Sequence, residues 1–256
     1  MPKAHVHKHT DNHSMAAAAA SHICQAAVEA IAARGRFNLA LSGGFTPLDT
    51  YRMLPETAAH AGLNWLHVYV FWSDERCVPT SDPANNYRMA HTNFLADVPI
   101  PNENIHPIEC EGDPEREAAR YEDLLRTHFR SEDTPQFDLV LLGLGRDGHV
   151  ASLFPKTEAL TEDERLVVAS FAPDRGQWRM SFTPKLINAA KGVVFLVRSK
   201  AKSEAVRQAF SQEVDPLKWP VRLVDPVEGT VHWFMDEAAA TLIGDEVSVH
   251  WAARDE

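Results

Sequence analysis

The sequence has few cysteines, few positive charges and no long uninterrupted hydrophobic segment. Its 3 cysteines in 256 residues are too few and too scattered for a disulfide framework or a zinc cluster, so we expect reduced, structural thiols. The 25 Lys and Arg residues are outnumbered by 36 Asp and Glu, which argues against nucleic-acid or membrane partners. No apolar run approaches the roughly 20 residues of a membrane span. The first residues also lack the apolar core of a signal peptide, so we expect a cytoplasmic protein.

The N-terminal segment "MPKAHVHKHTDNH" is polar and contains His5, His7, His9 and His13. Clustered histidines can bind a metal, but a flexible segment provides no scaffold to fix their geometry. We therefore expect residues 1–14 to be a disordered tail and assign no metal. The remaining residues, 15–256, show no linker, internal repeat or low-complexity segment, which predicts a single α/β domain.

From residue 14 onward, helical and strand patterns alternate along the chain. Strands are predicted for the apolar runs 37–41, 65–76, 137–145, 165–172, 192–199, 221–226 and the beginning of 230–243. Helices are predicted for 14–34, 46–54, 82–95, 113–129, 202–210 and the end of 230–243. Ser14 can cap the first helix, which stops at Gly35, and Thr46 can cap the second with Pro47 in its first turn.

Continuously apolar strands that alternate with helices indicate a mostly parallel sheet covered on both faces. We therefore predict a Rossmann-like, three-layer α/β/α sandwich. Ligands of such sheets bind at the carboxyl ends of the strands, so the loops after Leu41, Trp72, Leu142 and Val197 are candidate binding loops.

The loop "GLGRDGHVASLFP" (143–155) begins with a literal G-x-G-x-x-G, as in dinucleotide-binding folds. That fingerprint requires a helix opening on the third glycine and an acidic residue at the end of the next strand. Here Pro155 would break such a helix early, and the nearby acids precede the next strand. The context therefore favours a catalytic loop, and we expect no cofactor.

The turn Ser42-Gly43-Gly44-Phe45-Thr46 has the features of a phosphate-binding loop. Its glycines allow close approach of a ligand, its hydroxyls can donate, and the following helix N-terminus favours an anion. The alternative is an ordinary strand-to-helix turn, which these features alone do not exclude.

The other candidate loops contain paired charges. Asp147 and His149 form a possible acid–base pair, because a carboxylate can orient an imidazole that accepts a proton near neutral pH. Asp74 and Arg76 follow the second strand, where a structural ion pair is the alternative interpretation. Arg179 and Lys202 are further cations that could neutralise a phosphate or remain solvated surface charges.

These segments resemble the 6-phosphogluconolactonase family of sugar-phosphate enzymes. The resemblance rests on "LALSGGFTP", "WSDERCVPTSDPANNYRMA", "FDLVLLGLGRDGHVASLFP", "RMSFTPKLINAAKGVVFLV" and "VRLVDPVEGTVHWFMDEAA", which span about residues 37–240. It implies a fold shared with sugar-phosphate isomerases and hydrolysis of 6-phospho-D-glucono-1,5-lactone to 6-phospho-D-gluconate, in the oxidative branch of the pentose phosphate pathway. No cofactor is implied, and the oligomeric state is expected to be a monomer or homodimer.

By resemblance, His149 is the general base beside Asp147, and Arg76 contacts the lactone or acid group. Ser42–Thr46 would hold the sugar phosphate with Arg179 and Lys202. Three positions depart from the family pattern: Ser181 replaces a threonine, Asn85 replaces a serine, and Ser199 replaces a glycine, which leaves Lys202 the least secure assignment.

Two rival functions stay open. A glucosamine-6-phosphate deaminase shares the glycine turn and "DGH", but it has a carboxylate five positions after the histidine, where this chain has Phe154. It also typically has a tyrosine at the position of Arg76. A non-catalytic sugar-phosphate sensor on the same fold would bind the sugar phosphate without accelerating lactone opening.

Overall fold

The main sheet of the computed structural model has six parallel strands in the order β1-β9-β8-β5-β2-β3. The structure describes residues 4–244 except 111, 132, 173–175 and 212. The strands are β1 (Ala4–His9), β2 (Phe37–Leu41), β3 (Val68–Trp72), β5 (Leu139–Gly143), β8 (Gly192–Val197) and β9 (Thr230–Asp236). Because all six run in the same direction, their carboxyl ends meet at one edge, as predicted.

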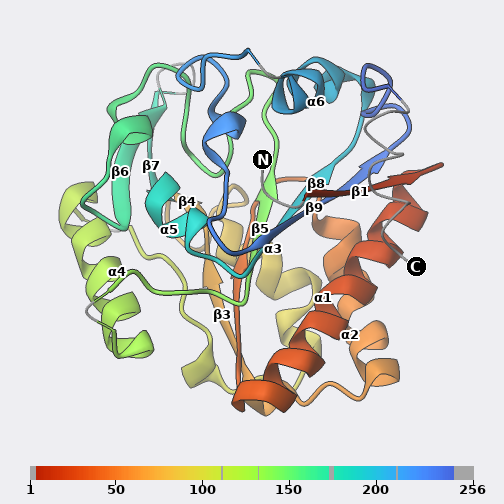
Figure 1. Ribbon diagram of the computed structural model, residues 1–256. Helices are drawn as coiled ribbons and strands as arrows, with labels where there is room; N and C mark the ends of the chain where they lie inside the picture. The colour runs from red at the N-terminus through yellow and green to blue at the C-terminus, as the bar shows by residue number, and fades with distance from the viewer. Residues whose placement is uncertain (1–3, 111, 132, 173–175, 212, 245–256) are drawn as a thin grey trace.

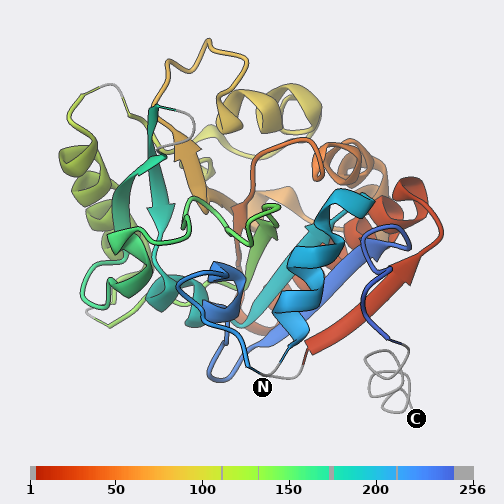
Figure 2. The same ribbon diagram turned by 90° about the horizontal axis from the view of Figure 1, so that it is seen from above.

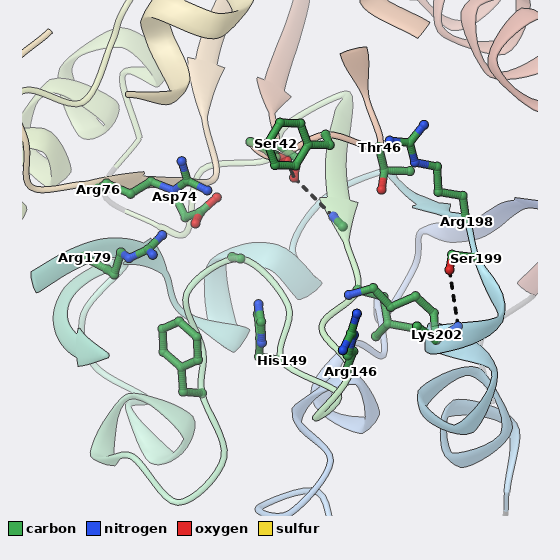
Figure 3. Close-up of a pocket in the computed structure, with 18 residues that line it drawn as sticks. Ser42, Thr46, Asp74, Arg76, Arg146, His149, Arg179, Arg198, Ser199 and Lys202 are labelled. Atoms are coloured by element: carbon green, nitrogen blue, oxygen red, sulfur yellow. Dashed lines mark hydrogen bonds between the residues drawn. The ribbon is translucent and has the colours of Figure 1, made fainter. Parts of the chain in front are cut away.

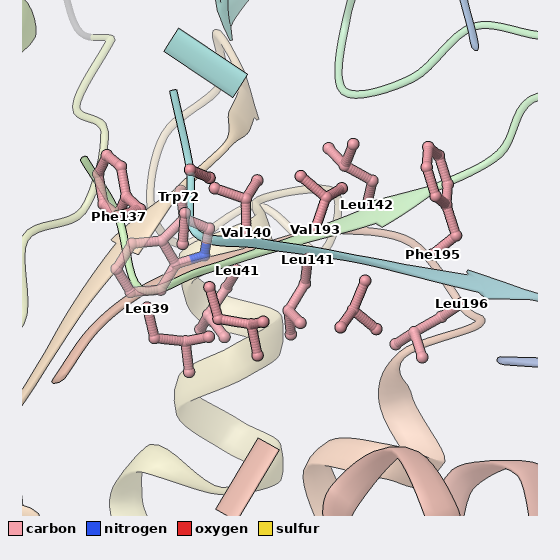
Figure 4. Packing of buried hydrophobic residues seen from close by; sticks show 14 of the residues in the cluster. Leu39, Leu41, Trp72, Phe137, Val140, Leu141, Leu142, Val193, Phe195 and Leu196 are labelled. Carbon is pink, nitrogen blue, oxygen red and sulfur yellow. The ribbon is translucent and has the colours of Figure 1, made fainter. Parts of the chain in front are cut away.

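Helices cover both faces of this sheet, so the α/β sandwich predicted from the alternation is confirmed. The α-helices of the described residues are α1 (Asn12–Arg34), α2 (Leu48–Ala61), α3 (Asn86–Asn93), α4 (Pro114–Phe129), α5 (Pro184–Asn188) and α6 (Ser203–Phe210). Figures 1 and 2 show α1 and α2 together on one side of the sheet and α6 on the other. The central strands are mostly apolar, as Leu141, Val193 and Leu39 illustrate in Figure 4, because both of their faces are buried.

A second, antiparallel sheet is the main difference from the predicted fold. It contains β4 (Asp74–Arg76), β7 (Gln177–Phe182) and β6 (Val167–Ala172), in the order β4-β7-β6. The predicted strand 65–76 is therefore divided at Ser73, and β7 was not predicted. Helix α4 packs on this small sheet, which lies to the left of the main sheet in Figure 1.

Several predicted boundaries were wrong. Residues 221–226 are not a strand, because Pro220–Leu223 form a short 3-10 helix. Residues 237–243, expected to be a closing helix, form successive turns. Helix α1 begins at Asn12, where Asp11 accepts a hydrogen bond from the Ser14 N–H, and ends at Gly35 as predicted. Pro47 occupies the cap position of α2, which has no side-chain capping hydrogen bond.

The N-terminal segment is ordered where it is described, contrary to the predicted tail over residues 1–14. Ala4–His9 pair with β9 as an edge strand. The rings of His5 and His7 stack on His232 at centroid distances of 4.6 and 5.5 Å, and His22 of α1 lies 4.2 Å away on the same ring. These imidazoles therefore act as aromatic packing groups, which explains how a histidine-rich segment can form a strand.

Cys77 and Cys110 form a disulfide across 33 residues of sequence, so the expectation of reduced thiols was wrong for this pair. The disulfide ties the residue after β4 to the segment that leads into α4. Cys24 is free and buried.

Helix α1 is long and apolar enough to cross a membrane by length and composition, with a mean hydropathy of 1.3 over its most apolar window. Its alanine-rich sequence was not recognised as such a run. In the structure α1 packs against α2 and β9, and buries Met15, Ala19 and Ile23.

The histidine cluster should make the fold sensitive to acid. Burial, and then repulsion from neighbouring histidines, lowers the pKa of His22 to about 4 and that of His232 to about 3, from an ordinary 6.5. Both are thus neutral in the folded state, while the unfolded chain takes up protons below pH 6.5, so stability is lost as pH falls from 6.5 toward 4. We expect His22→Leu to reduce this loss by about 2 kcal/mol at pH 4.5, measured by urea unfolding between pH 7.5 and 4.5. His60→Leu, at an exposed site, is the control, and an unchanged pH dependence in His22→Leu would contradict the prediction.

The disulfide should stabilise the fold by restricting the unfolded chain. We expect the double variant Cys77→Ser/Cys110→Ser to lose about 2–4 kcal/mol of unfolding free energy, measured by urea denaturation. The wild-type protein with excess dithiothreitol should unfold at the same midpoint as this variant. A wild-type midpoint that does not respond to the reductant would show that the bond does not contribute.

Candidate active site

Four loops at the carboxyl edge of the sheet line one pocket of about 410 Å³. They follow β2, β3, β5 and β8, the strands whose ends were predicted to bind the ligand. Every predicted site residue except Asp147 lines this pocket: Ser42, Gly43, Gly44, Thr46, Asp74, Arg76, His149, Arg179 and Lys202. Figure 3 shows His149 between the side chains of Arg76 and Arg179 and those of Arg146 and Lys202.

Asp147 is not part of the pocket lining, but it holds the imidazole of His149. His149 Nδ1 lies 2.6 Å from Asp147 Oδ1, and the His149 backbone N–H also donates to this oxygen at 3.3 Å. A carboxylate only accepts hydrogen bonds, so Nδ1 carries the proton and Nε2 is the nitrogen left to act as a base. Burial opposes ionisation of Asp147, but the hydrogen bonds and charge of His149 outweigh it, so the pKa of this carboxyl lies below its ordinary value.

The glycines of the G-x-G-x-x-G sequence make room for this pair. A Cβ at Gly145 would overlap His149 Nδ1 and Asp147 Oδ1. Gly148 has a φ of +79° and lies against Trp219, so a side chain there would be both strained and obstructed. The sequence that resembles a nucleotide cradle is therefore a close-packed support for an acid–base pair.

The turn after β2 is fixed to the strand that carries this loop. Ser42 Oγ accepts the Gly143 N–H at 3.2 Å, and Tyr51 of α2 donates its hydroxyl to the Ser42 carbonyl at 2.8 Å. A Cβ at Gly43 would overlap the Asn86 side chain, so glycine is required by close packing at this position. The turn thus presents backbone N–H groups near the start of α2, as a phosphate site requires.

Arg76 and Arg179 lie directly opposite each other on β4 and β7 and line the pocket together. Like charges in opposing positions of a sheet are unfavourable, and Arg179 is only 5% exposed. The Arg76 guanidinium also donates to the Ala84 carbonyl. The two guanidinium-bearing side chains bring positive charge to this side of the pocket, which suits an anionic ligand.

Asp74 is the acidic side chain of the pocket lining. It is 6% exposed, and its Oδ2 accepts a 2.7 Å hydrogen bond from Ser152 Oγ. Because Ser152 follows His149 in the same loop, this bond ties the His149 loop to β4. Burial raises the pKa of the neighbouring Glu75 to about 7, although three backbone N–H groups from Asn86, Arg76 and Tyr87 oppose the shift.

Sequence reasoning missed two cations of the pocket, Arg146 and Arg198. Both lie in loops that had been selected as binding loops, after β5 and β8, so their position at strand ends was the available signal. Within the described residues no group of three or more His, Cys, Asp or Glu side chains could hold a metal ion.

The pocket thus combines an oriented imidazole, several cations and an open turn at a helix N-terminus. These features define an α/β enzyme that performs acid–base chemistry on a small anionic substrate. The chain belongs to the family of glucosamine-6-phosphate isomerases and 6-phosphogluconolactonases, whose sequence profile matches residues 10–233.

The similar proteins come from both branches of this family. A 6-phosphogluconolactonase of Synechocystis sp. is 45% identical over 214 residues, which cover 82% of this chain and 86% of the relative. The crystal structure of the 6-phosphogluconolactonase from Leishmania guyanensis is 29% identical, with a TM-score of 0.80 over 95% of this chain and 99% of that one. A monomeric glucosamine-6-phosphate deaminase, at 22% identity and a TM-score of 0.78 over 93% of this chain and 99% of that one, shares the fold.

Replacing Gly145 tests the packing of the acid–base pair. Because an added methyl group would displace His149 from its position, we expect Gly145→Ala to lower kcat about 10²-fold. A Cβ at Gly143 would meet only Ser42 Oγ at 3.7 Å, so Gly143→Ala is the matched control and should lose much less. Steady-state kinetics, with circular dichroism to confirm folding, measures both, and equal effects of the two variants would contradict the prediction.

Proposed function

We propose that His149, oriented by Asp147, is the general base of a lactone hydrolysis in this pocket. The activity is hydrolysis of 6-phosphogluconolactone, a step of the pentose phosphate pathway. The observation that carries the assignment of roles is the 2.6 Å bond between His149 and Asp147, with His149 lining a pocket that also contains four arginines and a lysine.

The reaction requires an activated water, a stabilised oxyanion and a proton for the departing ring oxygen. His149 Nε2 takes a proton from water as the water attacks the lactone carbonyl, and returns it to the ring oxygen when the C–O bond breaks. Asp147 stabilises the imidazolium that forms in between. Arg76 faces the oxyanion, and no covalent enzyme intermediate is required.

Phosphate binding supplies affinity away from the reacting bond. The turn Ser42–Thr46, Arg179 and Lys202 hold the phosphate, and this fixed end positions the carbonyl against the water.

Phe154 favours lactone hydrolysis over deamination. Its ring lies 4.7 Å from the ring of His149 and lines the pocket. A carboxylate five positions after the histidine is what the deaminase branch has, and this chain places an apolar ring there. The fold does not separate the two activities, so this side chain is the distinguishing feature. A pure sensor is disfavoured, because the complete acid–base pair is retained.

A pH-stat assay with 6-phosphogluconolactone tests the proposal. We expect His149→Ala to lower kcat by about 10²–10⁴ while calorimetric binding of 6-phosphogluconate stays nearly unchanged. Arg179→Ala should instead weaken that binding. Unchanged hydrolysis by His149→Ala, after subtraction of the spontaneous rate, would exclude its role as base, and release of ammonia from glucosamine 6-phosphate would identify a deaminase.

A further inference from the structure

Arg198 has no role in the proposed reaction, although it lines the pocket beside Ser199 and Lys202. It is the first residue after β8, so the end of a buried strand fixes its backbone. Its side chain is 35% exposed and therefore partly withdrawn from water. In Figure 3 its guanidinium lies toward Thr46, at the turn that precedes α2.

The nearest charged partner of Arg198 is Asp49, in the first turn of α2. Arg198 NH1 lies 3.7 Å from Asp49 Oδ2, which is longer than a hydrogen bond between these groups. Among the described residues we find no other hydrogen bond of this guanidinium. Its N–H donors thus remain available to a ligand while Asp49 attracts the charge.

Asp49 presents an electrostatic problem for an anion-binding site. The positive end of the α2 dipole favours an anion, and the Asp49 carboxylate in the first turn already occupies that position. This carboxylate would also repel a bound phosphate. Three side chains surround it: Asn12 of α1 donates to Oδ2, Arg52 lies 3.3 Å from Oδ1, and Arg198 approaches Oδ2. Of these, only Arg198 also lines the pocket.

We propose that Arg198 is a specificity-determining ligand of the substrate phosphate, and that Asp49 is the positioning residue that holds it at the phosphate site. Arginine suits this role because its planar fork can donate two parallel hydrogen bonds to phosphate oxygens. The same guanidinium offsets the charge of Asp49, which would otherwise oppose phosphate binding at the helix N-terminus. The inference rests on the proposed function, since the phosphate belongs to the lactone substrate.

The test compares Arg198→Met with Arg52→Met. Both variants remove a cation from Asp49, but Arg52 is outside the pocket lining. We expect Arg198→Met to raise KM for 6-phosphogluconolactone about 10–100-fold, with kcat changed less than about threefold. Its kcat/KM for unphosphorylated glucono-1,5-lactone should not change. Arg52→Met should leave all these constants near wild type, and Arg198→Lys should recover part of the lost affinity.

Asp49→Asn tests the positioning role. Alone it should raise KM moderately, because Arg198 loses its anchor. In Arg198→Met it should cost nothing further, or should restore affinity, since the carboxylate then only repels the phosphate. Losses that multiply independently in the double variant would overturn the role of Asp49.

The outcomes separate this inference from the proposed function. If the wild-type enzyme hydrolyses 6-phosphogluconolactone but Arg198→Met keeps its preference for the phosphorylated lactone, the inference on Arg198 is wrong and the function stands. If the wild-type enzyme does not hydrolyse it, the proposed function fails. Calorimetric binding of inorganic phosphate to wild type and Arg198→Met then still decides whether Arg198 binds phosphate. Matching thermal unfolding curves exclude misfolding as the cause of any loss.

Discussion

The active site depends on the parallel pairing of β5 with β2 on one side and with β8 on the other. Parallel strands end at the same edge, so this pairing alone brings together three loops that are far apart in sequence. Each loop then contributes different groups: the turn after β2 offers backbone N–H groups, the loop after β5 holds His149, the proposed base, and the loop after β8 supplies cations. Since these strands are buried on both faces, their ends are rigid supports for the loops.

The small antiparallel sheet supplies pocket side chains that the parallel sheet does not carry. Its strand β4 leaves the end of β3 at Ser73, whose hydroxyl donates to the carbonyls of Leu41 and Leu141 at 3.0 and 3.3 Å. This serine is fully buried at the junction, so it links the two sheets where Asp74 and Arg76 begin. Antiparallel pairing of β4 with β7 therefore positions Arg76 and Arg179, whereas His149, the proposed base, lies in a loop of the parallel sheet.

Elements with a strong hydrophobic pattern could be predicted from the sequence. Elements that bury a polar residue, or that depend on a contact with a residue distant in the sequence, could not. Strand β5 and helix α4 were evident from their apolar periodicity. Strand β7 was missed because it contains the buried Arg179. An arginine is typical of an exposed loop, and the sequence does not show which residues surround it in the fold. Strand β1 was missed because histidine is classed as polar, whereas His5 and His7 stack as aromatic rings on His232.

Site features that depend on residues distant in the sequence could likewise not be predicted. The glycine turn and the Asp147–His149 pair are local in sequence, so their chemistry could be predicted from one segment each. The Cys77–Cys110 pairing and the contact of Arg198 with Asp49 join segments separated along the chain, and only the fold brings them together. Nothing in the spacing of these residues encodes that proximity.

A strongly acidic protein can bind an anion because charge acts locally. The formal net charge of −11 is spread over the whole surface, and charges beyond about 8 Å are screened at physiological ionic strength. Within the pocket, Arg76, Arg146, Arg179, Arg198 and Lys202 face a single acidic lining residue, Asp74. Ligand binding and folding stability are coupled, because a ligand that occupies the pocket of the native state stabilises that state by mass action.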